Sequence, residues 1–213
     1  MADWIKEAET DVDAMFDSLS DLAASLPDEL QTKVEELRAQ HKRLKSRIAA
    51  VGKHKPSGHC SRIHGDYHLG QLLVVQDDLM VVDFEGEPRR SLQERRRKSS
   101  PLRDVAGMLR SIDYCAASAM EKVTQPEQPR RPAMERIELW YETFRRDFET
   151  AYREHVTGSP TWPDDEAFAR KLLDLFLIQK TAYEVSYELA NRPTWVGIPL
   201  GGLLKLLDPE QSL

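Results

Sequence analysis

The chain has 213 residues, a length that fits one domain or one lobe with an appendage. It is 40% hydrophobic and 31% charged, which is ordinary for a globular protein that buries a core. The formal net charge of -6 disfavours nucleic-acid binding by bulk charge, because no global basic field exists to release counterions. Two cysteines are too few for a disulfide framework, and no apolar run approaches the roughly 20 residues that span a bilayer. With no signal-like start either, we expect a cytoplasmic protein that works without a membrane.

Two amphipathic helices are predicted before the first motif. Residues 3–25 carry apolar side chains at helical spacing, and a second helix begins at Pro27 and continues to Gly52. We expect the two helices to associate in antiparallel fashion. A coiled-coil partner surface is the rival interpretation, although the apolar spacing is not sustained over enough heptads. Residues 53–58 are predicted to form a loop.

A short hairpin follows the sequence His64-Gly65-Asp66. The apolar runs 72–75 and 79–82 are separated by a polar turn, which is typical of two strands joined tightly. Gln71 directly precedes the first strand, and Asp83 directly follows the second. Because the second strand returns beside the start of the first, we expect Asp66, Gln71 and Asp83 to lie close together.

The segment from Gly86 to Ser100 is strongly basic. One interpretation is a solvated loop; the other is a loop that resembles a kinase activation segment and lies near phosphate or pairs with acidic side chains. The segment is too short to predict a DNA or RNA site. Its basic residues are Arg89, Arg90, Arg95, Arg96, Arg97 and Lys98.

The rest of the chain is predicted to be helical. Helices are expected over 101–123, 133–156, 163–191 and 199–207, with Ser100 as an N-cap. Three prolines, at 126, 129 and 132, predict a surface linker after the first of these. The helix over 133–156 carries an aromatic stripe that we assign to the core, as we do Cys60 and Cys115. The fold class is therefore mainly α with one small hairpin.

Asp66, Gln71 and Asp83 carry the chemistry of phosphoryl transfer. A carboxylate that accepts a hydroxyl proton, combined with an amide and a second carboxylate that hold magnesium, is the arrangement of kinase catalytic loops. Magnesium takes few protein oxygens, because phosphate and water complete its coordination. We assign Asp66 as the catalytic base, and Gln71 and Asp83 as ligands of Mg²⁺ and, through it, of ATP.

The motif His64-Gly65-Asp66, with its amide at Gln71 and the later Asp83-Phe84, resembles the aminoglycoside-phosphotransferase-like kinases. Further blocks are similar to the maltokinase family, found free or fused to trehalose synthase: 83–88, 94–98, 100–110 and 187–193. The resemblance covers about residues 59–200. It implies the C-terminal lobe of a kinase-like fold at 59–213, phosphorylation of maltose to maltose 1-phosphate with ATP and Mg²⁺, and a helical connector at 1–58 to an absent N-lobe. Such a lobe is expected to be inactive by itself.

Other residues receive supporting roles. Lys180, Tyr183, Glu184 and Tyr187 share one helix face, and the maltokinase resemblance implies that Lys180, Tyr183 and Tyr187 contact the sugar. A Lys–Glu pair with packed tyrosines explains the same spacing. His68 is predicted to point toward substrate; Glu85 joins the metal or substrate shell, or pairs with an arginine. His64, Arg103 and Asp104 are predicted to support the catalytic loop.

Three alternatives remain at this point. A zinc site formed by the histidines between His54 and His68 together with Cys60 is the first, although these residues lack the spacing of a four-ligand site. The acceptor could be glucosamine or another small sugar, because the three catalytic-loop residues do not select one. A non-catalytic docking module that uses the acidic N-terminal helices is the third possibility.

Overall fold

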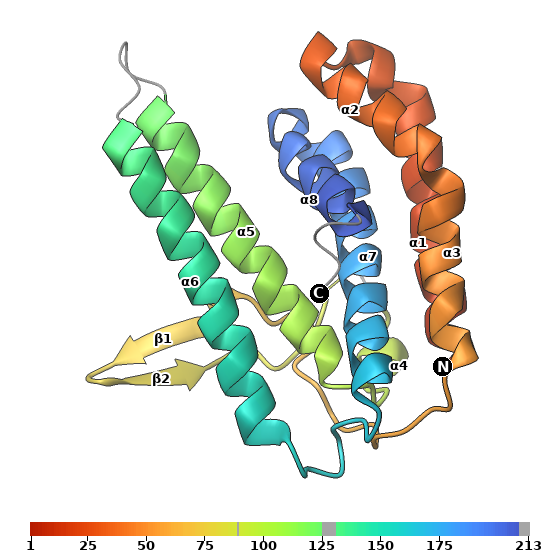
Figure 1. Cartoon of the computed structure of the whole chain (residues 1–213), viewed down its shortest axis with the longest axis vertical. Coiled ribbons are helices and arrows are strands. Elements are labelled where there is room, and N and C mark those ends of the chain that lie inside the picture. Colours follow the sequence, from red (N-terminus) through yellow and green to blue (C-terminus); the bar gives the residue numbers. More distant parts are fainter. Residues whose placement is uncertain (89, 125–130, 209–213) are drawn as a thin grey trace. The chain divides into compact units, whose positions relative to one another are not determined.

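The computed structural model describes residues 1–88, 90–124 and 131–208 (Figure 1). Arg89 of the basic segment, and Pro126 and Pro129 of the predicted linker, lie outside the described residues. Within them the chain is mainly helical with one two-stranded antiparallel sheet, so the predicted fold class is confirmed at that level. No helix in these ranges is long and apolar enough to cross a bilayer.

The chain divides into two compact units. The first contains residues 1–57 together with 163–213, and the second contains residues 58–162. The predicted division into 1–58 and 59–213 differs from this, because the C-terminal helices group with the N-terminal ones.

The first unit is a helical assembly around α7. Its elements are α1 (Ala2–Leu22), a 3₁₀ turn (Ala23–Ser25), α2 (Asp28–Ala39), α3 (His41–Ala50), a 3₁₀ turn (Val51–Lys53), α7 (Glu166–Asn191), a 3₁₀ turn (Pro193–Trp195) and α8 (Gly197–Leu207). Helix α1 buries Ala8, Val12, Met15 and Leu19, which follow the three- and four-residue spacing of one helix face. This face packs on α7, and the Trp4 ring meets the Phe176 ring edge-on at 5.4 Å between centroids. Asp165 begins α7 by accepting the N–H of Ala167 at 2.9 Å.

The helix predicted from Pro27 to Gly52 is in fact two helices. The chain leaves helical geometry at Gln40, where φ is -94° and ψ is 5°, and α3 restarts at His41. The His41 ring then lies 4.4 Å from the Phe16 ring, and α3 buries Leu44 and Ile48. No proline or glycine marks this break, which is why the apolar pattern alone predicted a continuous helix.

The second unit contains the hairpin and two long helices. Its elements are a 3₁₀ turn (Leu69–Gln71), β1 (Leu72–Val75), β2 (Asp78–Val81), α4 (Leu92–Arg95), α5 (Leu102–Thr124) and α6 (Arg131–Val156). Strands β1 and β2 pair with Leu72 opposite Val81 and Val75 opposite Asp78. The turn is therefore the two residues Gln76 and Asp77, one fewer than predicted, and Gln76 takes φ +56°.

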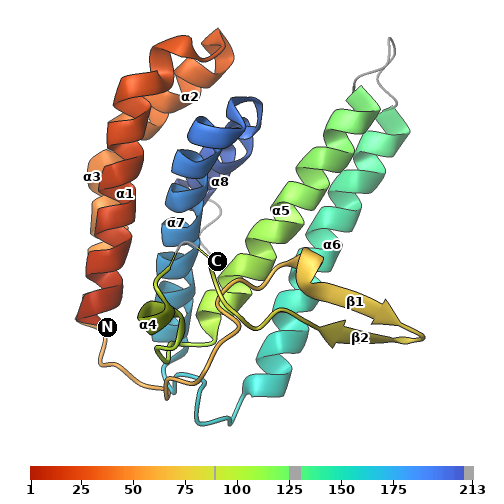
Figure 2. The ribbon, with the colours of Figure 1, turned by 180° about the vertical axis from the view of Figure 1, so that it is seen from behind.

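The hairpin exposes apolar side chains. Val74 is 79% exposed, Leu79 58% and Met80 53%. Figure 2 shows β1 and β2 extending as an isolated ribbon. A lone two-stranded hairpin is marginally stable in water, so its base must be held by other parts of the unit.

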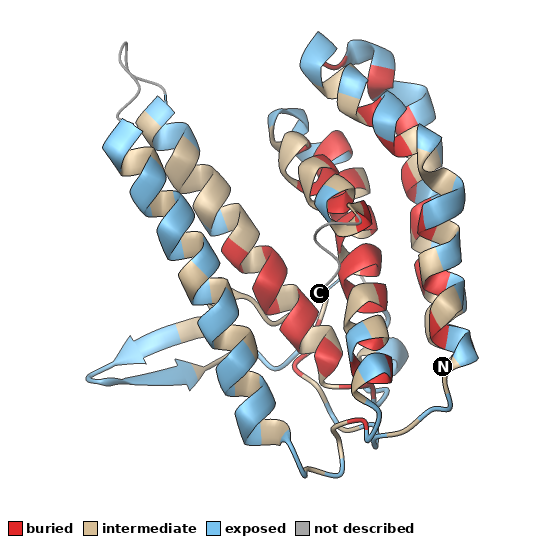
Figure 3. Ribbon diagram, viewed as in Figure 1, coloured by how far each residue is buried: buried red, intermediate tan, exposed pale blue. Residues whose placement is uncertain are grey.

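The aromatic stripe of α6 was predicted to be core, and this prediction is wrong. No residue of α6 is buried, as Figure 3 shows by the absence of red on this helix. Trp140 and Phe144 are each 38% exposed. Within the second unit α6 packs on α5, and one neighbouring helix covers only part of a stripe that wide. The prediction that Cys60 and Cys115 are core residues is also wrong, because both thiols are exposed.

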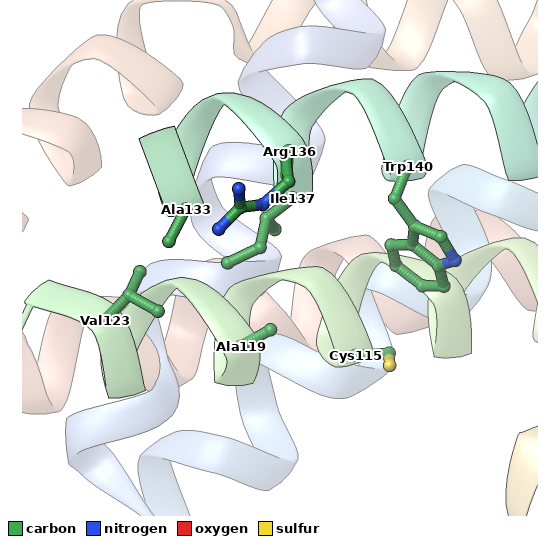
Figure 4. A pocket seen from close by; sticks show the side chains of 7 residues that line it. All are labelled: Cys115, Ala119, Val123, Ala133, Arg136, Ile137 and Trp140. Carbon is green, nitrogen blue, oxygen red and sulfur yellow. The ribbon is translucent and has the colours of Figure 1, made fainter. Parts of the chain in front are cut away.

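An open apolar groove lies between α5 and α6. Figure 4 shows that α5 contributes Cys115, Ala119 and Val123, and α6 contributes Ala133, Arg136, Ile137 and Trp140. None of the described residues that line it carries a carboxylate or a carboxamide, the groups that phosphoryl transfer requires.

Candidate functional site

Asp104 holds the backbone of the loop that contains Asp66. It lies in the first turn of α5, and its two carboxylate oxygens accept the N–H of His64 at 2.7 Å and the N–H of Gly65 at 2.8 Å. Gly65 has φ +85°, a left-handed conformation that glycine adopts without strain. Asp104 therefore fixes the two residues that immediately precede Asp66.

The protonation of Asp104 reflects opposing effects. Burial raises the pKa of this carboxyl group, because the charged form loses hydration. The N–H groups of Gly65 and His64 oppose this shift by donating to the charged form. The nearby negative charge of Asp104 adds to burial in raising the pKa of the Tyr67 phenol.

Two further positions on the same face of α5 contact the loop. A Cβ atom placed on Gly107 would lie 2.6 Å from the carbonyl oxygen of Tyr67, so the helix and the loop meet backbone to backbone. Ser111 accepts the N–H of Leu69 through its hydroxyl at 3.0 Å. Sequence reasoning missed both residues. The available signal was their spacing, since 104, 107 and 111 lie on one helix face and a glycine inside a helix often marks a close approach.

His64 joins the loop to the base of the hairpin, where the second strand ends. Its side chain is buried, and its Nε2–H donates to the carbonyl oxygen of Val82 at 2.8 Å. The ring lies 4.9 Å from the Phe84 ring, and Nδ1 accepts the N–H of Asp66 at 3.4 Å. One buried imidazole thus spans from the residue before Asp83 to Asp66 itself.

The structure brings Asp66, Gln71 and Asp83 into one connected cluster. The Gln71 carboxamide donates from Nε2 to Oδ2 of Asp83 at 3.1 Å. Oδ2 of Asp66 lies 3.9 Å from Nε2 of His68, which in turn lies 3.5 Å from Nε2 of Gln71. The Asp66 side chain is 22% exposed and Asp83 is exposed, so solvent and ligands reach both carboxylates.

The backbone at Asp83 is unusual. Its φ is +62°, and Asp83 and Gln76 are the two non-glycine residues with positive φ among those described. Such a conformation in a non-glycine residue carries a free-energy cost and is frequent at functional sites. It directs the carboxylate to Gln71, at the base of the hairpin.

A glycine contact and an arginine hold the turn that follows Asp83. A Cβ on Gly65 would lie 3.3 Å from the Cα of Gly86, so the two loops touch through residues that have no side chain. The aliphatic part of Arg95 covers Gly86, and Arg95 donates from Nη1 to the carbonyl oxygen of Glu85 at 3.2 Å. Arg95 belongs to the short helix α4, and Ser91 and Glu94 form a capping box at the N-terminus of this helix.

The oxygen donors at this cluster fit a magnesium ion. Asp83 offers a carboxylate and Gln71 a carboxamide oxygen, both hard ligands of the kind that Mg²⁺ prefers. The described ranges contain no group of three His, Cys, Asp or Glu side chains that could hold a metal ion by themselves.

The remaining predicted residues lie elsewhere. The Glu85 side chain is exposed, and Arg103 donates from Nε to the Ser99 hydroxyl at 3.3 Å. Lys180, Tyr183 and Tyr187 belong to α7 in the first unit. Lys180 Nζ lies 5.4 Å from the centre of the Tyr183 ring, and the Tyr183 and Tyr187 rings stack at 6.3 Å.

The end of α7 carries a second aromatic group. Arg192 makes a two-pronged ion pair with Glu188, at 2.9 and 2.6 Å. Its guanidinium lies 5.6 Å from the centre of the Tyr187 ring and 5.0 Å from that of Trp195. Trp195 thus packs on Arg192 within the first unit.

Comparison with known proteins finds glucosamine kinases. The chain is 30% identical over 149 residues to the glucosamine kinase of Streptacidiphilus jiangxiensis, which is 70% of this chain and 32% of that protein. It is 28% identical over 149 residues to the glucosamine kinase of Mycolicibacterium smegmatis, at 70% and 35% coverage. No family model matches the chain.

These relatives are sugar kinases. Solved glucosamine kinases share the fold: one crystal form gives a TM-score of 0.77 at 24% identity over 98% of this chain and 47% of that chain. Another, in complex with glucosamine, ADP and inorganic phosphate, gives 0.72 at 24% identity over 96% and 46%. The chain thus spans less than half the length of each of these relatives. They support a sugar-kinase family and do not support maltokinase in particular.

Proposed function

We propose that this chain carries the phosphoryl-transfer site of an ATP-dependent sugar kinase, with glucosamine as the acceptor. The observation that carries the proposal is the cluster in which Gln71 contacts Asp83 at 3.1 Å while His68 lies between Gln71 and Asp66. Both curated relatives described above are glucosamine kinases, which favours glucosamine over maltose as the acceptor.

Asp66 acts as the catalytic base in this proposal. Phosphoryl transfer needs little covalent chemistry from the protein, so the carboxylate mainly orients the sugar hydroxyl and accepts its proton. The hydrogen bonds that Asp104 accepts from the N–H groups of His64 and Gly65, and the contact of Gly107 with Tyr67, keep the Asp66 carboxylate in place. Gln71 and Asp83 hold Mg²⁺, which when bound neutralises charge on the phosphates of ATP.

We further propose that the chain is the C-terminal lobe of the kinase and that a lobe outside it covers ATP. Two observations support this. The chain matches 45–47% of the solved glucosamine kinases. The apolar side chains of the hairpin are exposed, which is typical of a surface that packs on further protein. Lys180, Tyr183 and Tyr187 remain our candidates for sugar contact, as do Glu85 and His68.

Maltose is the second acceptor to be tested, because the order of motifs from Asp83 to Pro193 resembles maltokinase. The proposal of a fusion to trehalose synthase rests on that resemblance alone. A role as a docking module without catalysis is the third possibility, and it predicts no dependence of any activity on Asp66.

A chimera tests the proposal. The chain is joined to the part of the Streptacidiphilus jiangxiensis glucosamine kinase that it does not match, and transfer of phosphate from ATP to glucosamine and to maltose is measured. We expect transfer to glucosamine to be faster, and the Asp66→Asn variant to be about 10²–10⁴-fold slower, as is typical for loss of a general base. The chain alone is expected to show only background transfer.

The matched control is Asp77→Asn, in the exposed turn of the same hairpin. This variant is expected to retain the rate of the unchanged chimera. Full activity in the Asp66→Asn chimera would refute the assignment of Asp66. Faster transfer to maltose would replace glucosamine by maltose, and substantial transfer by the chain alone would refute the missing lobe.

A further inference from the structure

His68 is held in one orientation by the backbone that follows it. Its Nδ1 accepts the N–H of Gly70 at 3.0 Å, which caps the 3₁₀ turn of Leu69–Gln71. Gly70 leaves room for the ring: a Cβ at that position would lie 2.8 Å from Cε1 and 2.9 Å from Nδ1 of His68. The imidazole is therefore folded over Gly70 with its other nitrogen directed away from the turn.

This hydrogen bond determines which nitrogen carries the proton. Only an unprotonated ring nitrogen accepts a hydrogen bond, so the neutral His68 ring has its hydrogen on Nε2. Nε2 lies 3.5 Å from Nε2 of Gln71. Both atoms are then donors, and no hydrogen bond joins them in this arrangement.

The Gln71 carboxamide has its nitrogen toward the cluster. Nε2 donates to Asp83, as expected when the carboxylate is the nearest charge. A cation shared by Gln71 and Asp83 requires the amide oxygen instead, because an amide nitrogen is not a metal ligand. A half-turn of the carboxamide exchanges the two atoms, and Oε1 then faces the N–H of His68 that it can accept.

We propose that His68 is a positioning residue that stabilises the metal-binding orientation of the Gln71 carboxamide. Its Nε2–H donates to Oε1 and leaves the remaining lone pair of that oxygen for the cation. The inference rests on the proposed function, because it needs the magnesium site at Gln71 and Asp83. It gives His68 a role in metal affinity in addition to the contact with substrate expected from the sequence. Partners of this kind around metal ligands typically change affinity by 10–100-fold.

The test uses the whole chain and Mn²⁺ as a magnetic substitute for Mg²⁺. The dissociation constant of Mn²⁺ is measured by electron paramagnetic resonance for the unchanged chain and for His68→Asn, His68→Ala, Asp83→Asn and His59→Ala. Asparagine at 68 keeps an oxygen that accepts the Gly70 N–H, as N-cap residues do, but is too short to reach Gln71. His68→Asn therefore separates the structural cap from the positioning role.

We expect His68→Asn and His68→Ala to bind Mn²⁺ about tenfold more weakly than the unchanged chain. His59→Ala, at an exposed histidine of the same unit, is expected to bind it equally well. Nitrogen-15 spectra of the unchanged chain should place the His68 proton on Nε2. If His68→Asn matches the unchanged chain while Asp83→Asn is weakened, or if the proton lies on Nδ1, the inference on His68 is wrong. If Asp83→Asn also matches the unchanged chain, the metal site itself is wrong and the inference fails with it.

Discussion

At the scale of single residues, the site depends on backbone contacts as much as on its carboxylates. Asp66 is held by groups that contact the backbone of its loop: Asp104, through two hydrogen bonds, and Gly107, through its close approach to Tyr67. A shift of the loop by about 1 Å can lower a catalytic rate about a hundredfold, since the reacting groups must be aligned. The residues that support the loop are therefore as sensitive to change as Asp66.

Gly107→Ala tests this packing. The added methyl group would lie 2.6 Å from the Tyr67 carbonyl oxygen, so α5 and the loop must separate. We expect the free energy of unfolding to fall by about 1–3 kcal/mol, as is usual for overpacking. Denaturant unfolding followed by circular dichroism measures it.

The control for this prediction is the same substitution in another helix. Gly201 lies inside α8 with nothing within 4 Å of the added methyl group. Gly201→Ala is expected to stabilise the chain by about 0.5–1 kcal/mol, because alanine favours helix over glycine. Equal changes in the free energy of unfolding for Gly107→Ala and Gly201→Ala would contradict the close approach of Gly107 to Tyr67.

At the scale of elements, α5 and α6 are joined by a polar network. Asp113 accepts hydrogen bonds from Arg110 at 2.5 Å, Tyr141 at 2.8 Å and Arg145 at 3.1 Å. Arg145 also pairs with Glu149 at 3.2 Å, although burial raises the pKa of Glu149. Since Arg110 is buried and no residue of α6 is, we assign much of the stability of this helix pair to the network.

Asp113→Ala is expected to lower the free energy of unfolding by about 3 kcal/mol, the lower end of the range for removing one partner of a buried ion pair. The physical reason is the charge of Arg110, which stays buried without Asp113. Asp147→Ala is the control, because its pair with Arg146 is 64–70% exposed and such pairs contribute roughly 0–1 kcal/mol. A loss of similar size in both variants would contradict the role of the network.

The Tyr141 phenol gives the same helix pair a dependence on pH. Burial, followed by the charge of Asp113, raises its pKa to about 12 from an ordinary value of 10.0. Below about pH 10 the folded and unfolded chains both hold this proton, and the contribution to stability is complete. Between about 10 and 12 the unfolded chain loses the proton first, so stability falls as the pH rises.

In Tyr141→Phe, the free energy of unfolding should fall less between about pH 10 and 12 than in the unchanged chain. Denaturant unfolding at a series of pH values measures this difference. The absorbance of tyrosinate provides a second measurement. Burial also raises the pKa of Tyr67, and that of Tyr152 to about 12, so the late component of the unchanged chain should become smaller by one tyrosine in the variant. An unchanged late component in Tyr141→Phe would disprove the assignment.

Local patterns predicted the elements well where each has one apolar face. The helices at 101–123 and 163–191, and the paired strands, follow directly from spacing, and Asp66, Gln71 and Asp83 meet because a hairpin must return beside its start. The break at Gln40 carries no sequence signal. Helix α4 was not predicted, although the sequence carries a signal for it: Ser91 and Glu94 have the spacing of a capping box. The exposure of α6 depends on how many neighbours cover it, and the orientation of the Gln71 amide depends on contacts that no spacing encodes.

At the scale of the whole molecule, one of the two compact units is built from segments that are far apart in the sequence. Residues 1–57 and 163–213 share one core, and the unit with the Asp66 cluster is inserted between them. The helices at the start of the chain are thus part of the same hydrophobic core as α7, which carries the proposed sugar-binding face. A change in α3 should therefore affect α7 although the two are far apart in sequence.

Leu44→Ala in α3 tests this organisation. Leu44 is fully buried, and such a truncation typically lowers the free energy of unfolding by about 2–5 kcal/mol. Hydrogen exchange followed by mass spectrometry should show faster exchange in 1–57 and 163–208, and a smaller change in 58–124 and 131–162. Leu139→Ala, at a residue 65% exposed, should change neither set appreciably. Equal acceleration in both units after Leu44→Ala would contradict the division.

The most direct test of the account is where a divalent cation binds in the presence of ATP. Mn²⁺ broadens the nuclear magnetic resonance signals of nearby residues, so an isotopically labelled chain reports the position of the ion. The account predicts that the signals of Asp66, Gln71 and Asp83 broaden first, while those of Asp77 and Asp78 at the far end of the hairpin broaden later. Broadening centred on that turn, or on any place that spares Asp83, would contradict it.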